Sequence, residues 1–124
     1  MRLLDSLYTI ASTELTDNGP IFTIGLNAEH FIYKAHFPGE PITPGVCILQ
    51  IAHELLEVHC DAKLEIDCVK NVKFLRVITP DATPVVSYAF QKLVFEEESV
   101  KCQVSVMAED EALAKLSIIF RKQR

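Results

Sequence analysis

The spacing of apolar residues changes along the chain, and the change predicts one long helix between two sets of strands. Residues 46–58 contain no Gly or Pro and repeat apolar residues at helical spacing. Thr43 is the expected N-cap and Pro44 the expected first helical residue, where a missing N–H has no cost. Because apolar positions cover most of the circumference, we expect this helix to be buried. These positions are Val46, Ile48, Leu49, Ile51, Ala52, Leu55, Leu56 and Val58.

Strands are expected on both sides of this helix. Residues 6–15 and 22–26 flank the turn signal at residues 16–20, which predicts a hairpin. Beyond the helix, β-branched or alternating residues are separated by proline-containing or acidic turns, and residues 121–124 should be a frayed basic tail. We therefore expect an α+β fold of residues 1–124 in one domain, with a buried helix wrapped by five or six antiparallel strands. The later strands are expected at residues 66–78, 84–91, 100–106 and 113–120.

The composition narrows the classes of protein to be considered. The chain has 124 residues, 49% of them hydrophobic and 23% charged, which is typical of a folded single domain. The net charge of −5 disfavours a nucleic-acid partner, although a local basic patch for an acidic partner remains compatible with it. No apolar run is long enough to span a membrane, and the N-terminus has no extended apolar core, so we expect a cytoplasmic protein without a signal peptide.

Cysteine and histidine spacing gives no sign of a metal site. The four cysteines form no C-x-x-C pair and are expected to be reduced thiols. His53 and His59 are six residues apart, which is not a ligand spacing of known zinc sites. The cysteines are Cys47, Cys60, Cys68 and Cys102.

A stiff loop with a histidine leads directly into the predicted helix. Residues 36–57 contain three of the six prolines and two of the four glycines. Proline fixes φ and glycine permits unusual backbone angles, so the first part should be tightly turned. The imidazole of His36 is then expected near the free N–H groups and the positive dipole end of the helix.

The residues of this loop resemble a known family. The pattern H-F-P-G-x-P-x-x-P-G-V from His36, followed by a helix, resembles the signature of the 3-hydroxyacyl-(acyl carrier protein) dehydratases, which have the hotdog fold. A second stretch, K-F-L-R-V-I-T-P at residues 73–80, resembles the family's strand after the helix. That strand usually ends in Pro-Gly-Asp, whereas this chain has Pro80-Asp81-Ala82. The resemblance covers nearly the whole chain and implies fatty acid or related polyketide-type biosynthesis.

The resemblance also implies a role for individual residues. It makes His36 the base that takes a proton from C2 when a 3-hydroxyacyl thioester loses water to give the trans-2-enoyl thioester. The backbone N–H of Gly45 becomes the oxyanion donor, and a side chain there would crowd the thioester. Residues implied to contact the substrate are Phe31, Phe37, Pro44, Val46 and His53. Tyr33 could also line the acyl tunnel. For the three aromatic residues, packing in the core is the alternative.

The family's acidic residue is replaced in this chain. Fourteen residues after His36, where the family has Glu or Asp, stands Gln50, and an amide cannot supply a proton. One turn later stands Glu54, where the family often has Gln, so the two residue types look exchanged. Glu54, reaching directly or through a water, or His53 could act as the acid. Alternatively, both belong with Glu57 to a polar stripe on the helix.

The expected partners follow from the same resemblance. The substrate would arrive on the phosphopantetheine of an acidic acyl carrier protein, with no other cofactor, and Lys70, Lys73 and Arg76 are candidate docking residues. In the family the active site lies at a dimer interface, with the histidine from one subunit and the acid from the other. We expect a homodimer or higher oligomer, with a second hotdog subunit as an alternative, and no membrane or nucleic-acid partner. Joining two sheets would also cover an exposed edge strand.

Three hypotheses about function remain open at this point. The first is an active dehydratase that uses His36 with Glu54 or a water. The second is a catalytically impaired subunit, with Gln50 in place of the acid, that binds an acyl carrier or a catalytic relative. The third is a hotdog acyl thioesterase in which Glu54 activates water, although the loop motif favours a dehydratase.

Overall fold

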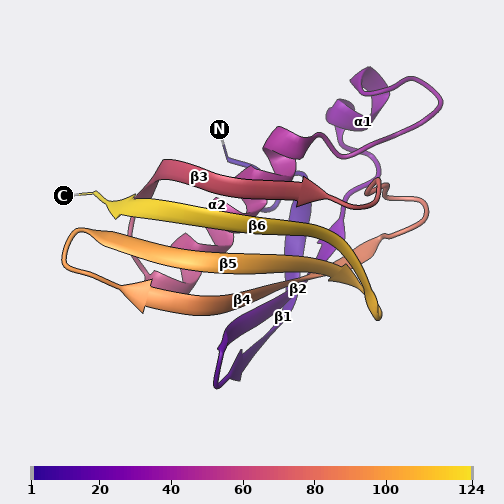
Figure 1. Cartoon of the computed structure of the whole chain (residues 1–124). Coiled ribbons are helices and arrows are strands. Elements are labelled where there is room, and N and C mark those ends of the chain that lie inside the picture. Colours follow the sequence, from indigo (N-terminus) through magenta and orange to yellow (C-terminus); the bar gives the residue numbers. More distant parts are fainter. Residues whose placement is uncertain (1, 124) are drawn as a thin grey trace.

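A computed structural model describes residues 2–123 (Figure 1). Within this range, six strands form one antiparallel sheet in the order β1-β2-β4-β5-β6-β3. The sheet curves around the long helix α2, which lies against its inner face (Figure 1). The elements are β1 (Tyr8–Thr16), β2 (Gly19–Leu26), α1 (Phe31–Ala35), α2 (Gly45–Cys60), β3 (Leu64–Phe74), β4 (Val85–Phe95), β5 (Ser99–Ala108) and β6 (Glu111–Lys122).

The core lies between α2 and the inner face of the sheet. Successive strand residues point to opposite faces, so every second residue is buried in the first half of β4, up to Phe90, and in β5 from Val100 to Val106. Each fully buried large apolar side chain contributes about 1.5–3 kcal/mol, which makes this contact the main source of stability. The arrangement confirms the predicted hotdog fold. Among the most deeply buried core side chains are Tyr8, Phe22, Ile51, Leu55, Leu56, Tyr88, Phe90, Leu113, Ile118 and Phe120.

The predicted long helix is confirmed, but its start and its burial differ from expectation. Pro44, not Thr43, is the N-cap, and the first helical residue is Gly45. Thr43 is buried, and its hydroxyl is hydrogen-bonded to that of Tyr33 at 2.9 Å, so it has no role in capping. The helix is also less enclosed than its apolar pattern predicts, because Val46 and Val58 are 64% and 47% exposed.

Three local predictions were wrong. The short helix α1 lies in a connecting segment for which no helix was predicted. Strand β3 ends at Phe74, so residues 75–84 form a loop instead of continuing a strand to residue 78. Arg121 and Lys122 are part of β6, where Arg121 forms an ion pair with Glu65, so this part of the expected tail is ordered.

The two edges of the sheet are β1 and β3. Strand β3 pairs with β6 through two register shifts, between Ile66 and Cys68 and between Val69 and Asn71. Most of its residues are exposed. The four cysteines are free thiols, and within residues 2–123 no helix has the length and apolar character needed to cross a membrane.

Candidate functional site

His36 is held by a loop that folds back on itself. Its backbone N–H donates to Ile32 O at 2.9 Å, which closes α1, and its carbonyl accepts from the N–H of Ile42 at 2.9 Å. The ring atom Nδ1 lies 3.4 Å from Ile42 O. Because a carbonyl only accepts, Nδ1 is the donor in this contact. Nε2 is therefore the ring atom that is left to exchange a proton with a substrate.

The start of α2 lies beside this imidazole. Cys47 N and Ile48 N both donate to Pro44 O, at 2.9 and 3.1 Å. The N–H groups of Gly45 and Val46 come before these and have no acceptor within the helix. Together with the positive end of the helix dipole, they form a site suited to a developing negative charge.

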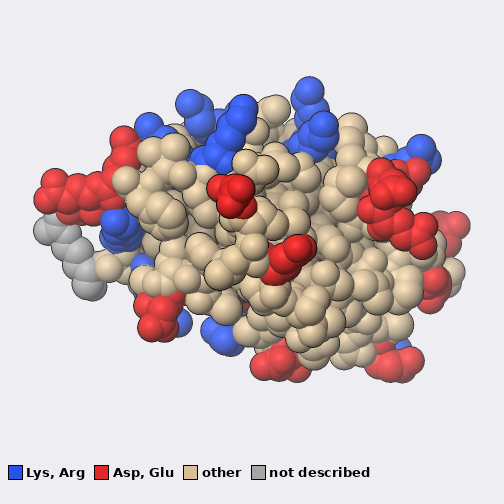
Figure 2. Space-filling view, turned by 90° about the horizontal axis from the view of Figure 1, so that it is seen from below, with Lys and Arg blue, Asp and Glu red and all other residues tan. Residues whose placement is uncertain are grey.

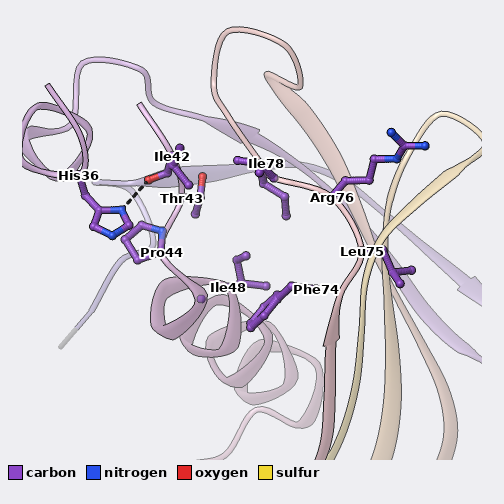
Figure 3. Close-up of a pocket in the computed structure, with 11 residues that line it drawn as sticks. His36, Ile42, Thr43, Pro44, Ile48, Phe74, Leu75, Arg76 and Ile78 are labelled. Atoms are coloured by element: carbon purple, nitrogen blue, oxygen red, sulfur yellow. Dashed lines mark hydrogen bonds between the residues drawn. The ribbon is translucent and has the colours of Figure 1, made fainter. Parts of the chain in front are cut away.

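An apolar cavity of about 490 Å³ connects these two features (Figure 3). His36 lies on one side of it, and residues at and after the end of β3 lie on the other (Figure 3). Among the described residues that line it, His36 is the only histidine, and no carboxylate is present. The lining residues are His36, Ile42, Thr43, Pro44, Gly45, Ile48, Phe74, Leu75, Arg76, Val77 and Ile78.

An aromatic side chain lies close to Gly45. A Cβ on Gly45 would lie 2.8 Å from Cζ of Phe74. The ring of Phe74 is 51% exposed and packs over the first turn of α2. The family resemblance implies that a side chain at position 45 would crowd the substrate, and the structure adds that such a side chain would also press on the Phe74 ring in the wall of the cavity.

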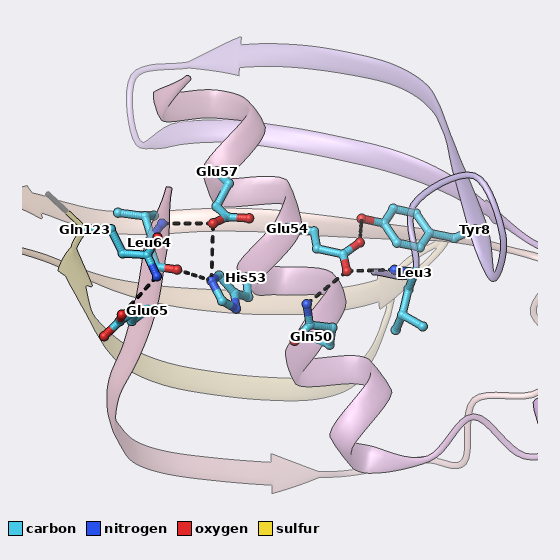
Figure 4. A network of polar contacts seen from close by, with 9 residues as sticks. All are labelled: Leu3, Tyr8, Gln50, His53, Glu54, Glu57, Leu64, Glu65 and Gln123. Carbon is cyan, nitrogen blue, oxygen red and sulfur yellow. Dashed lines mark hydrogen bonds and ion pairs between the residues drawn. The ribbon is translucent and has the colours of Figure 1, made fainter. Parts of the chain in front are cut away.

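Glu54 lies in a different environment, buried in a hydrogen-bond network (Figure 4). Among the described residues, four groups donate to its carboxylate: Leu3 N and Leu4 N at 2.8 Å, Tyr8 Oη at 3.0 Å and Gln50 Nε2 at 2.9 Å. Each of the two carboxylate oxygens accepts from two of these donors. Burial, and then the negative charge of Glu54, raise the pKa of Tyr8. Glu54 does not line the cavity that contains His36 of the same chain.

His53 and Glu57 join α2 to the start of β3 (Figure 4). His53 Nε2 donates to Leu64 O at 2.6 Å, and Leu64 N donates to Glu57 Oε2 at 2.8 Å. The His53 ring also packs against Phe120, with ring centroids 5.5 Å apart. These contacts place His53 outside the cavity, and they agree with the alternative of a structural polar stripe.

The other candidate residues lie in three places. His36, Pro44, Gly45 and Arg76 line the cavity. The side chains of Phe31, Phe37 and Val46 are exposed and do not line it, although the Phe37 ring stacks on His36 with centroids 4.1 Å apart. Lys70 and Lys73 are exposed on β3. Sequence reasoning missed Phe74, and the only signal for it was its place between Lys73 and Arg76 in the second motif.

Comparisons with known proteins agree with this architecture. A family model described as "ApeI-like: ApeI dehydratase" matches residues 12–116. A 3-hydroxyacyl-[acyl-carrier-protein] dehydratase FabZ of Wolbachia pipientis (strain wPip) is 31% identical over 107 residues, which cover 77% of this chain and 73% of the relative. The chain belongs to the FabZ-like hotdog dehydratase family. A second FabZ-like relative, FabZ of Wolbachia pipientis wMel, is 27% identical over 83% of this chain and 76% of its own length.

Solved structures show the same hotdog fold as this FabZ-like chain. A chain of the dehydratase heterocomplex ApeI:P from Xenorhabdus doucetiae has a TM-score of 0.66 and 14% identity, covering 91% of this chain and 96% of that one. YhdA of Lactococcus lactis, a proposed thioesterase, has a TM-score of 0.70 and 12% identity, with full coverage of both chains. At such low identity these similarities establish the fold alone.

Proposed function

We propose that this chain removes water from a 3-hydroxyacyl thioester to give the trans-2-enoyl thioester, with the acyl group delivered by an acyl carrier protein. Membership in the dehydratase family supports the reaction class, and the FabZ relatives are named for a carrier-bound substrate. The observation that carries the proposal is the cavity where His36 meets the start of α2. His36 and the first helical residue, Gly45, border there an apolar space that fits an acyl thioester.

The reaction begins at C2 of the substrate. Nε2 of His36 takes the proton from C2 while Nδ1–H remains on Ile42 O. Negative charge moves onto the thioester oxygen, where the N–H of Gly45 and the dipole of α2 stabilise it. The electron pair then forms the C2–C3 double bond and the C3–O bond breaks.

The departing hydroxyl needs a proton to leave as water. The amide of Gln50 cannot supply one, and the carboxylate of Glu54 is occupied by its four donors. The imidazolium formed at His36 carries the proton taken from C2, and it returns that proton from Nε2–H to the hydroxyl oxygen. His36 is thereby neutral again, and the enoyl thioester and one water molecule are released.

In this proposal the active form of the enzyme is a dimer of hotdog chains. Ile66 and Val69, on the edge strand β3, are 37% and 38% exposed. A second chain paired along this edge covers them and satisfies the free backbone groups. A homodimer is the simplest form of this assembly.

The test is interconversion of a carrier-bound enoyl and 3-hydroxyacyl pair by the purified protein alone, followed by enoyl absorbance or mass spectrometry. Turnover well above background that disappears in His36→Ala is the expected result. A folded dimer without turnover across several chain lengths would contradict the proposal.

A partner subunit without its own activity is the second candidate. It is favoured by one observation: no carboxylate of the described residues lines the cavity. The similar ApeI:P structure is described as a dehydratase heterocomplex, so a chain of this fold occurs there together with a different chain. Turnover only after a second hotdog chain with Glu or Asp at the position of Gln50 is added would favour this candidate.

The thioesterase alternative finds less support, because Glu54 was its water-activating group and lies outside the cavity. Release of free thiol, measured in the same assay, would distinguish it from a dehydratase.

A further inference from the structure

The segment that carries both His36 and Gly45 reaches the core through two side chains. Of the described residues 31–46, Tyr33 and Thr43 are buried, at 3% and 4% exposure, and every other residue is at least partly exposed. The two hydroxyl oxygens lie 2.9 Å apart and form one hydrogen bond inside the protein. A buried polar group is costly unless it has such a partner. Tyr33 and Thr43 thus link the two sides of the segment through the protein interior.

Tyr33 determines how the short helix α1 lies. Among the five described residues of α1 it alone is buried, and a helix this short is not stable without contacts to the rest of the fold. The N–H of His36 donates to Ile32 O at 2.9 Å, so the proposed base directly continues this helix. A rotation of α1 about its axis would therefore move the imidazole. Burial raises the pKa of Tyr33, so its hydroxyl stays protonated and bonded to Thr43.

Thr43 determines where α2 begins. Its backbone N–H donates to Ile78 O at 2.8 Å, and Ile78 is itself buried in the wall of the cavity (Figure 3). Pro44 follows, and its carbonyl accepts the first hydrogen bonds of α2. Gly45, whose N–H is the proposed oxyanion donor, therefore lies two residues after a position that is held by both its backbone and its side chain. The hydroxyl pair connects this fixed position to α1.

No ion pair takes over this role. Besides His36, the segment contains two charged side chains, Lys34 and Glu40, and neither forms an ion pair with a described residue. In Figure 2, Lys and Arg lie mainly along the upper border of the molecule and many Asp and Glu gather at its two ends, and ion pairs between such exposed groups are weak. The backbones of Phe37 and Glu40 bond to each other, which joins loop residues together but does not join them to the core.

We propose that Tyr33 and Thr43 are positioning residues, whose hydrogen bond sets the distance between the imidazole of His36 and the N–H of Gly45. The inference rests on the proposed function and deepens it. C2 and the thioester oxygen of the substrate are attached to the same carbonyl carbon, so the base and the oxyanion donor must be placed to match each other. A misplacement of about 1 Å can lower a rate by about 10²-fold. Tyr33 does not line the cavity, so its hydroxyl can affect turnover only through the position of other groups.

The experiment compares stability with turnover of the carrier-bound enoyl and 3-hydroxyacyl pair in a double-mutant cycle. Tyr33→Phe and Thr43→Val each leave one buried hydroxyl without its partner. Each should lower the melting temperature by about 3–8 °C and kcat by about 10–100-fold, with a smaller change in KM. In the double variant neither hydroxyl is present, so the melting temperature should return close to that of the parent. Its kcat should stay low, because the directional contact is missing.

Two further variants separate positioning from stability. Thr43→Ser keeps the hydroxyl and should retain most of the turnover. Tyr8→Phe is the matched control, because it also removes the hydrogen bond of a buried tyrosine, here to Glu54, and Tyr8 does not line the cavity. It should lower the melting temperature by a similar amount and leave kcat unchanged. The inference would be overturned by unchanged kcat in Tyr33→Phe, by an equal loss of kcat in Tyr8→Phe, or by recovery of kcat together with stability in the double variant.

Amide hydrogen exchange distinguishes failure of this inference from failure of the proposed function. If the parent protein does not turn over the substrate pair, the proposed function fails, and exchange then tests the positioning pair alone. The N–H groups of His36 and Ile42 donate to Ile32 O and His36 O. In the double variant they should exchange at least about tenfold faster than in the parent, relative to the N–H groups of the core strand β5, which report overall stability. Unchanged relative exchange of both groups would overturn the inference.

Discussion

The first and third turns of α2 differ in whether their polar groups have hydrogen-bond partners. The third turn contains Glu54, 9 residues after Gly45. At Gly45 and Val46, backbone N–H groups remain without an intrahelical acceptor beside an apolar cavity and a histidine. At Glu54 the carboxylate is buried and takes hydrogen bonds from the backbone of residues 3 and 4, from Tyr8 and from Gln50. One helix therefore carries a region prepared for a ligand and a region whose polar groups are already satisfied.

This difference distinguishes polar groups that can act on a substrate from polar groups that stabilise the fold. A buried polar group with a full set of partners stabilises the fold, because breaking any contact leaves an unpaired group in the interior. Polar groups that keep free hydrogen-bonding capacity beside a cavity can instead respond to a substrate. On this criterion His36 and Gly45 belong to the site, and Glu54 anchors the N-terminal segment.

The largest expected effect is on turnover at the first region. His36→Ala removes the base, so the rate of dehydration should fall by about 10²–10⁴-fold. The melting temperature should stay nearly the same, because the ring contributes one long hydrogen bond and a surface stack on Phe37. His59→Ala is the matched control, since His59 does not line this cavity. Retained turnover in His36→Ala would remove the histidine from the mechanism.

At the second region, the main effect should be on stability. Glu54→Ala leaves the N–H groups of Leu3 and Leu4 and the hydroxyl of Tyr8 without their acceptor. Each unsatisfied buried donor costs about 1–3 kcal/mol, so the free energy of unfolding should fall by at least about 2 kcal/mol. Urea denaturation measures this loss. Normal stability combined with lost turnover would reverse the assignment of Glu54.

A carboxyl at position 50 would test the boundary between the two regions. Gln50→Glu supplies the missing acid, so turnover should rise by up to about 10²-fold. Nε2 of Gln50 lies 2.9 Å from Glu54, so the new carboxyl would lie beside an ionised one and its pKa would rise. An unchanged rate would mean that another group already protonates the leaving hydroxyl.

The same variant makes a prediction about pH. The new carboxyl would have a folded-state pKa above its unfolded value, so its contribution to stability is present at low pH. That contribution is lost as pH rises through the raised pKa. The melting temperature of Gln50→Glu relative to the parent should therefore fall between pH 5 and pH 8. Gln50→Met, which adds no charge, should show no such trend.

The smallest effect is expected at Tyr8. Tyr8→Phe removes one of the donors to Glu54 and leaves the buried ring in place. The free energy of unfolding should fall by about 1 kcal/mol, as measured by thermal or urea denaturation. A loss as large as that of Glu54→Ala would show that the hydroxyl, and not the backbone donors, holds the network together.

Local sequence patterns predicted most of the fold and the core of the cavity. Alternation in β4 and β5 and the helical spacing of α2 depend on neighbouring residues, so they could be read directly. The short helix α1 was missed because five residues carry too little periodicity. Thr43 was misplaced as a cap because its hydroxyl pairs with Tyr33, a tertiary contact that outweighs its capping preference.

The candidate site was predicted only where it lies on one continuous motif. His36, Pro44 and Gly45 come from the loop and the first turn of α2, and the structure brings them to one cavity. Phe74 reaches Gly45 from a distant strand, and Leu3 reaches Glu54 across 51 positions. No local pattern reports such contacts, so the exchange of Gln50 and Glu54 could not be interpreted before the partners of Glu54 were known.

The two register shifts in β3 restrict how chains of this protein can aggregate. An exposed edge strand is a template for open-ended growth, in which each added chain offers a new edge to the next. Each shift in β3 interrupts the even spacing of backbone groups, so a flat incoming strand would lose its pairing after a few residues. The β3 strand of a second chain has the same irregularities and could pair over a longer stretch. The β3 edges of both chains would then be covered. Pairing of two β3 edges would therefore leave neither of them available to a third chain.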